Sequence, residues 1–214
     1  MSHEECYSSY LAALCAGDRR SAFAAIGQGR EAGLDLRTLY LDVFQPALRE
    51  VGRLWQENRM NVAEEHLATA ITETAMLRLY MEQEIRKEGG PALVAACAET
   101  ERHAVGLRML CDLMELEGWH TTFLGASVPT DDLIELLRRR KADVLALSVA
   151  IDPHLPQLRR TITAVRETLG DTSPLVIVGG RPFLERPELA GVVGADLTAP
   201  DAATAALLLG ERVR

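Results

Sequence analysis

Glu101 and His103, two positions apart, are the residues of this sequence best suited to chemistry, and Gly106 follows them. An imidazole can ligate a metal ion through one ring nitrogen while a carboxylate accepts the proton on the other nitrogen and fixes the tautomer. A glycine at the start of the next element would let a bulky ligand approach the backbone. The spacing predicts a metal-ligating histidine, and the alternative is a solvated loop histidine with no ligand.

The segments on either side of this motif predict a strand before it and a helix after it. Four further strand and helix units follow along the chain. The third and fourth strands are nearly all apolar, which is typical of parallel strands that are buried on both faces. We expect strands near 92–98, 119–124, 143–149, 174–178 and 195–198, and helices near 104–117, 131–140, 155–168, 184–190 and 201–212. This pattern predicts a flavodoxin-like or Rossmann-like sheet of order 2-1-3-4-5, with its switch point beside the loop that carries His103.

Other features follow the strands of the same predicted sheet. Ser148 ends the third strand, and Gly179-Gly180 follow the fourth. Because the carboxyl ends of parallel strands share one edge, these residues and His103 would line a common groove. Glycines after a strand often only make a turn, but several such features along one groove favour a long inserted ligand.

The first part of the chain, from about 3 to 86, contains no convincing strand and predicts four antiparallel helices in a bundle. Pro46 should kink or split the third helix, expected over 36–56, and the fourth is expected over 62–87. The charged, Gly-Gly-ended stretch 84–90 is the expected linker. We therefore predict a four-helix bundle over 1–88 and an α/β domain over 91–214.

Composition excludes several classes of function. The formal net charge is -8, and the basic run 138–141 closes a helix, so direct nucleic-acid binding is not expected. The four cysteines form no CxxC pair, and no signal peptide or membrane-length apolar run is present. We expect a cytoplasmic protein without a membrane segment.

Glu101-x-His103-x-x-Gly106, with Ser148 and Gly179-Gly180, resembles the signature of cobalamin-binding domains of the methionine synthase type. The resemblance implies that His103 is the lower cobalt ligand and that the nucleotide tail passes Gly106, Ser148 and the two glycines. It also implies that the helical bundle caps the upper face of the cobalamin. Two positions depart from the usual pattern, since Glu101 replaces Asp and Ala150 replaces Leu.

Trp55, followed after nine residues by Glu65-His66, resembles the cap motif of CarH-type light-responsive regulators. The resemblance implies that Trp55 covers the upper axial group and that Glu65 and His66 lie beside an adenosyl moiety. In an unrelated bundle these would be a core tryptophan and an exposed helix start. No room for a helix-turn-helix domain is expected, so the chain resembles the stand-alone photocobilin modules, in which biliverdin is a second chromophore. No residue here establishes a biliverdin site.

These resemblances imply a light sensor that is not an enzyme. Adenosylcobalamin is the expected cofactor, with methylcobalamin as the other possibility, and His66 could ligate cobalt from above after photolysis. A homo-oligomer, dimer or tetramer, and a protein output partner are expected. The alternative is a corrinoid methyl carrier that serves separate methyltransferases, which requires His103 but not the Trp55 motif.

Two classes without cobalamin fit less well. A phosphoacceptor receiver domain would use Glu99, Glu101 and Asp152, but no lysine follows the fifth strand. A nucleotide-binding Rossmann site would need a GxGxxG motif after the first strand, and none is present there.

Two further histidines have weaker assignments. His154 lies after the third strand, where it could touch a corrin or begin a helix, and the helix start is favoured. His120 lies in a strand and has no assigned role.

Overall fold

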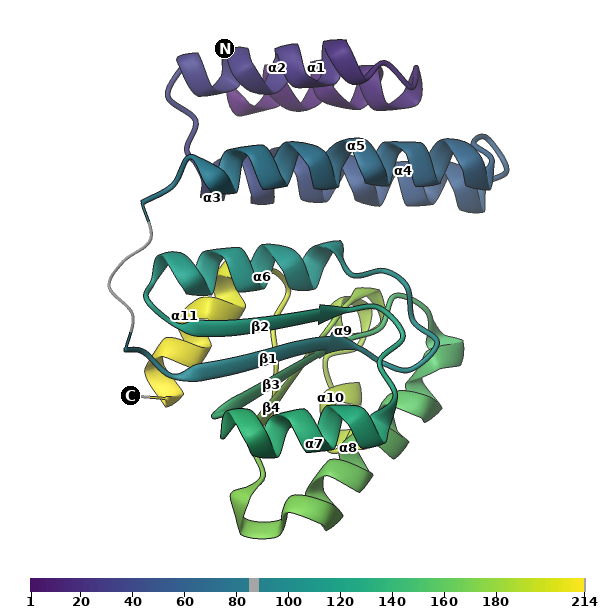
Figure 1. Ribbon diagram of the computed structural model, residues 1–214. Helices are drawn as coiled ribbons and strands as arrows, with labels where there is room; N and C mark the ends of the chain where they lie inside the picture. The colour runs from purple at the N-terminus through teal and green to yellow at the C-terminus, as the bar shows by residue number, and fades with distance from the viewer. Residues whose placement is uncertain (85–88, 214) are drawn as a thin grey trace. The chain divides into compact units, whose positions relative to one another are not determined.

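The computed structural model describes residues 1–84 and 89–213, and the chain divides into two compact units, Met1–Gln83 and Glu84–Arg214 (Figure 1). The expected linker, 84–90, includes residues 85–88, which lie outside the described residues. In the described part of the chain, no helix combines the length and the apolar character needed to cross a bilayer.

Helices are the only regular secondary structure in the described residues of the first unit. Side-chain caps begin its longer helices, with Ser2, Asp18 and Asn61 accepting from the amides of the first turn. Its core contains Tyr10, whose ring centroid lies 5.0 Å from that of Phe44. The helical elements are α1 (His3–Cys15), α2 (Arg19–Glu31), α3 (Leu36–Thr38), the π-helical turn η1 (Leu39–Phe44), α4 (Gln45–Gln56) and α5 (Val62–Met81).

The disturbance predicted at Pro46 takes the form of a π-helical turn rather than a split. The helical path continues through η1 into α4, with Phe44 and Gln45 in helical conformation and Pro46 in the first turn of α4. The last helix is shorter than predicted, because α5 ends at Met81 and Glu82 caps it.

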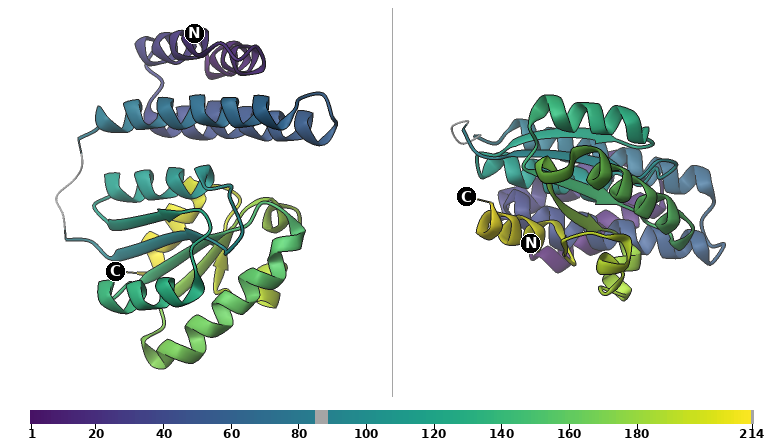
Figure 2. Two further views of the ribbon diagram at one scale, coloured as in Figure 1. Left: turned by 45° about the vertical axis from the view of Figure 1, so that its right-hand side comes forward. Right: turned by 90° about the horizontal axis from the view of Figure 1, so that it is seen from below.

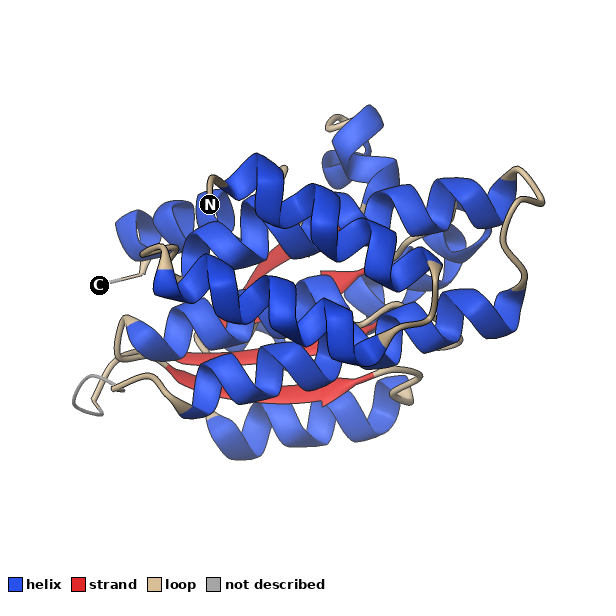
Figure 3. Ribbon diagram, turned by 90° about the horizontal axis from the view of Figure 1, so that it is seen from above, coloured by secondary structure: helices blue, strands red, loops and turns tan. Residues whose placement is uncertain are grey.

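The second unit contains five parallel strands in the order β2-β1-β3-β4-β5, which confirms the predicted sheet. Figure 3 draws its strands in red. The register pairs Cys97 with Ser148 and Ser148 with Gly179, so the ends of the three central strands lie level at one edge. The strands are β1 (Ala92–Cys97), β2 (His120–Gly125), β3 (Val144–Ser148), β4 (Leu175–Gly179) and β5 (Leu197–Thr198).

Helices cover both faces of this sheet (Figures 1 and 2). One face packs against α6 (Val105–Leu116) and α11 (Ala202–Arg212), which contact each other. The other face forms a core with α7 (Thr130–Arg140), α8 (Leu155–Leu169), α9 (Arg181–Glu185) and α10 (Leu189–Val193). The single helix predicted over 184–190 is wrong. Pro187 divides the segment into α9 and α10, because the residue before a proline is disfavoured in the helical conformation, and Arg186 leaves that conformation with φ of -141° and ψ of 75°.

Candidate functional site

A tight turn after β1 carries Glu101 into the interior of the second unit. The amide of Glu101 donates to the carbonyl of Ala98 at 2.8 Å, and Thr100 takes a left-handed conformation with φ of 79°. A β-branched residue is strained in that region of backbone space, and such strain tends to gather at functional sites. The turn leaves the Glu101 side chain with no exposed surface.

The Glu101 carboxylate accepts five hydrogen bonds from two segments of the chain. Its Oε1 accepts from the backbone amides of Arg102 (2.7 Å) and His103 (3.0 Å) and lies 2.5 Å from His103 Nδ1. Its Oε2 accepts from the amide of Ala150 at 2.7 Å and lies 2.9 Å from His154 Nδ1. Burial by itself would raise the pKa of Glu101. The hydrogen bonds from His103, Ala150 and His154 outweigh burial and hold that pKa well below its ordinary value. The carboxylate is therefore ionised at neutral pH.

This arrangement defines the tautomer of His103. With the Nδ1 proton donated to Glu101, the lone pair of the neutral ring is on Nε2. The His103 side chain is 52% exposed, so a bulky group can reach the ring from solvent. A neutral imidazole with its tautomer fixed by a carboxylate is a common metal-ligand arrangement. The geometry fits the role predicted from sequence, and the role itself stays a prediction.

His154 is the participant whose role was missed from the sequence. It begins helical structure as expected, in the 3-10 turn η2 (Asp152–His154) that leads into α8, but its ring also turns inward to Glu101. The available signal was its place just beyond β3, next to the switch point. Sequence spacing alone does not show that residues 101 and 154 share a hydrogen bond.

The glycines predicted to admit a ligand have different surroundings. A Cβ atom added at Gly106 or Gly179 would meet nothing within 4 Å, so both positions have open space beside the backbone. Gly180 has φ of 109°, and a Cβ atom there would lie 1.8 Å from the carbonyl oxygen of Val149. Gly180 is thus required by the backbone itself, whereas Gly106, Gly179 and the half-buried Ser148 remain predicted ligand contacts.

Replacing Glu101 with glutamine should make the second unit less stable and change its response to acid. The amide nitrogen of the glutamine would face N–H donors that now bind the carboxylate. This mismatch should lower the free energy of unfolding by about 2 kcal/mol at neutral pH. Because the folded-state pKa of Glu101 is lowered, its contribution is complete above the unfolded pKa near 4.5 and is lost as the pH falls below that value. Urea unfolding at pH 7, 5 and 3.5 should show that the difference in free energy of unfolding between parent and variant becomes smaller in acid.

Glu99→Gln is the matched control for that experiment. Glu99 is a half-buried carboxylate that accepts from Gln157 at 2.9 Å, so its loss should affect stability less. A gap for Glu101→Gln that stays constant from pH 7 to 3.5 would contradict the assignment of Glu101 as the ionised, hydrogen-bonded carboxylate.

The three cap residues predicted to lie at a ligand all belong to the first unit. Trp55 lies in the last turn of α4 and is 40% exposed. In the first turns of α5, Glu65 Oε2 lies 2.5 Å from His66 Nδ1, and the Thr69 hydroxyl donates to Glu65 Oε1 at 3.0 Å. The His66 side chain is 71% exposed. Glu65 orients His66 as Glu101 orients His103, and the ligand roles of these residues stay predictions.

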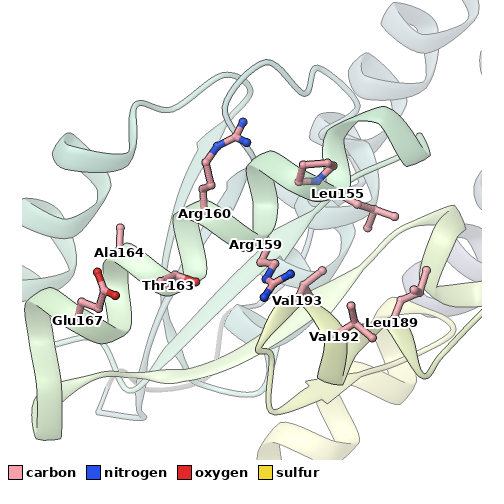
Figure 4. Close-up of a pocket in the computed structure, with 10 residues that line it drawn as sticks. Leu155, Arg159, Arg160, Thr163, Ala164, Glu167, Leu189, Val192 and Val193 are labelled. Atoms are coloured by element: carbon pink, nitrogen blue, oxygen red, sulfur yellow. The ribbon is translucent and has the colours of Figure 1, made fainter.

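A shallow groove of about 590 Å³ lies between α8 and α10 (Figure 4). It is lined by apolar residues such as Leu155, Leu189 and Val192, with Arg159 and Arg160 on α8. None of the predicted site residues lines it. The groove is therefore separate from the edge that carries His103.

Comparison with known proteins identifies both units. A family model described as "B12 binding domain" matches residues 91–207, and a second model with the same description matches residues 7–80. The chain is 28% identical to the HTH-type transcriptional repressor CarH of Myxococcus xanthus over 139 residues, which is 65% of this chain and 46% of the repressor. It thus spans just under half the length of that relative.

Two corrinoid proteins match nearly end to end. Dimethylamine corrinoid protein 1 of Methanosarcina acetivorans is 22% identical over 210 residues, 96% of each chain. The solved structure of the Methanosarcina barkeri monomethylamine corrinoid protein has a TM-score of 0.87, with 19% identity, 99% of this chain and 100% of that chain covered. At that identity the structural match establishes the fold.

Proposed function

The chain belongs to the B12-binding domain family and is a cobalamin-binding protein, and from that premise we propose that it is a corrinoid methyl carrier. In this proposal it presents bound cobalamin to separate methyltransferases and is their substrate rather than a catalyst. The supporting observation is the match to a dimethylamine corrinoid protein over 96% of both chains, set against 46% of the CarH repressor. It favours the corrinoid methyl carrier, the alternative predicted from the sequence, over the light sensor.

The residues of the second unit would hold the cofactor in the following way. His103 would ligate cobalt from below through Nε2, and Glu101 would keep the ring in the required tautomer. The open space beside Gly106 and Gly179 would accommodate the nucleotide tail against the backbone. When bound, cobalamin supplies a cobalt that can carry a methyl or other alkyl group on its upper face.

A light sensor is the second candidate, and a specific arrangement favours it. Trp55 closes α4, Glu65 and His66 begin α5, and the turn 57–61 joins the two helices. The histidine of the residues that resemble the CarH-type motif is exposed, and its Nδ1 lies 2.5 Å from the Glu65 carboxylate. In this function the first unit would cover the upper ligand, light would release that ligand, and an oligomeric change or a partner protein would transmit the signal.

The two functions differ in what they do in the dark and in light. Cobalamin-free protein should be titrated with adenosylcobalamin and with methylcobalamin to measure the two affinities. The molar mass of each loaded protein should then be measured by light scattering before and after green light. A carrier should bind the two forms within about tenfold of each other and keep its mass on illumination. It should also pass a methyl group in the dark to a thiol when a corrinoid methyltransferase is added. Selective binding of adenosylcobalamin together with a light-dependent change in mass would overturn the carrier and support the sensor.

A further inference from the structure

We propose that the groove between α8 and α10 is a docking surface for an acidic amphipathic helix of a partner protein. None of the predicted cobalamin contacts lines this groove, so the inference goes beyond the proposed function and applies equally to a carrier and to a sensor. It rests on an apolar surface bordered by two arginines, Arg159 and Arg160, that are complementary in charge to an acidic partner.

The apolar part of the groove is open to a partner. Leu155 of α8 and Leu189 of α10 are half-buried, and Val192 of α10 is 59% exposed. Covering these side chains would remove apolar area from water, which is the main favourable contribution to most protein associations. The groove therefore offers a surface that a partner with apolar side chains can bury.

The two arginines have no carboxylate partner among the described residues, although neighbouring arginines do. The Arg160 guanidinium donates instead to the neutral amide oxygen of Gln157. Both groove arginines thus keep their positive charge, in a chain whose formal net charge is -8. The neighbouring arginines of α8 and α9 that are paired with the chain's own carboxylates are Arg166 with Asp196, Arg181 with Glu185, and Arg186 with Asp152.

The positive charge lies toward one end of the groove. Figure 4 shows the Arg159 side chain extending from α8 toward Val193 of α10, while Arg160 extends from the other side of α8. Glu167, the carboxylate that lines the groove, follows Arg159 by eight positions on α8, or about 12 Å along the helix axis. A guanidinium binds carboxylates well because its donors match their geometry. A partner would therefore place its carboxylates near the end of the groove that begins at Leu155.

The walls of the groove favour a helix over an extended peptide. An extended peptide binds by adding backbone hydrogen bonds to a free sheet edge, whereas α8 and α10 are helices that bond their own backbone groups. A helix satisfies its own backbone and presents side chains at i, i+3, i+4 and i+7. The groove-lining residues of α8 run from Leu155 to Glu167, about 18 Å, which a helix of three to four turns would span.

Two other occupants fit the charges less well. An anionic membrane surface is typically bound by clusters of four to eight basic residues, and this groove has two. A second copy of this chain would bring another net charge of -8, so the two copies would repel each other. The charges therefore favour a separate protein that presents a local acidic helix.

The test uses two synthetic helical peptides of about 15 residues, long enough to span the groove. Both carry leucines at i, i+3, i+4 and i+7. One has glutamates beside the leucines, and the other has glutamines at the same positions, so the pair differs only in charge. Fluorescence anisotropy of each labelled peptide, titrated with the full chain loaded with hydroxocobalamin, measures the affinity. The glutamate peptide should bind about tenfold more tightly than the glutamine peptide.

Four variants place this binding in the groove. Arg159→Glu and Val192→Asn should each weaken binding of the glutamate peptide by about tenfold, as expected for central residues of an interface. The matched controls are Arg138→Glu on α7 and Leu207→Asn on α11, which make the same kinds of change at exposed positions outside the groove. Both controls should bind within about twofold of the parent. Should Arg159→Glu not fold, Arg159→Ala replaces it and is interpreted in the same way.

Cobalamin affinity should equal that of the parent in all four variants, so failure of the cobalamin site and failure of the docking surface are distinguishable. The proposal is overturned if the glutamate peptide does not bind, if the glutamine peptide binds equally well, or if the groove variants bind like the controls. It is also overturned if light scattering shows a dimer of the parent that dissociates in both groove variants, since a second copy would then fill the groove. Sedimentation with phosphatidylserine vesicles that both groove variants abolish would likewise replace the partner helix with a membrane.

Discussion

His103→Ala should remove the histidine-ligated spectrum of bound cobalamin and weaken binding by about a hundredfold or more. Loss of an outer-shell partner of a metal ligand typically costs 10- to 100-fold in affinity, so loss of the ligand itself should cost at least the upper end of that range. The fold should tolerate the change, because the side chain is 52% exposed and Glu101 keeps its four other hydrogen bonds. Visible absorbance after loading with methylcobalamin measures the first effect, and titration measures the second.

His120→Ala provides the matched control. It also removes an exposed histidine from the second unit, but at the start of β2, the end of the strand away from the loop that carries His103. Its spectrum and affinity should equal those of the parent. Visible bands in His103→Ala that are the same as in the parent would show that cobalt is held by another group, and the proposed site would then be wrong.

The fold could be predicted from sequence because its signals are local. The apolar runs of β3 and β4 indicate strands buried on both faces, and regular spacing of such strands with helices limits the sheet to a few topologies. Pro46 indicated a local disturbance of its helix, and the π-helical turn η1 lies directly before α4, which carries the proline in its first turn. The prediction over 184–190 was wrong because it ran a single helix across Pro187, where α9 has ended and α10 has not yet begun.

The site was predictable only in part, because hydrogen bonds between distant residues leave no spacing in the sequence. Glu101 and His103 are two residues apart, so their pairing could be proposed from the motif. The contact between Glu101 and His154 spans 53 positions and depends on the register of β1 against β3, which pairs Cys97 with Ser148. That register places the loops after the two strands side by side, and no local pattern shows it.

The Gly179-Gly180 pair shows a second kind of limit. In the sequence the two glycines are equivalent, and both were interpreted as space for a ligand. In the structure Gly179 closes β4 with open space beside it, whereas Gly180 lies against the backbone of Val149 with φ of 109° and ψ of 174°. Only glycine readily adopts that backbone region, so the two positions should respond differently to the same substitution.

Gly180→Ala should destabilise the second unit by about 4 kcal/mol, a large part of the 5–15 kcal/mol that stabilises a typical domain. The added methyl group would lie 1.8 Å from the Val149 carbonyl oxygen, a contact that only a backbone shift can relieve. That shift would disturb the hydrogen bond from the Val149 amide to the Gly179 carbonyl, which is 3.2 Å long and ties the β3 loop to β4. Urea unfolding followed by circular dichroism measures the loss.

Gly179→Ala is the control that separates folding from binding. Its methyl group meets nothing within 4 Å, so stability should change by less than about 1 kcal/mol. If the open space beside Gly179 receives the nucleotide tail, cobalamin affinity should nevertheless fall about tenfold, because the methyl group would occupy part of that space. Equal destabilisation by the two substitutions would contradict the backbone role assigned to Gly180. Unchanged cobalamin affinity in Gly179→Ala would instead remove Gly179 from the proposed binding site and leave the fold argument intact.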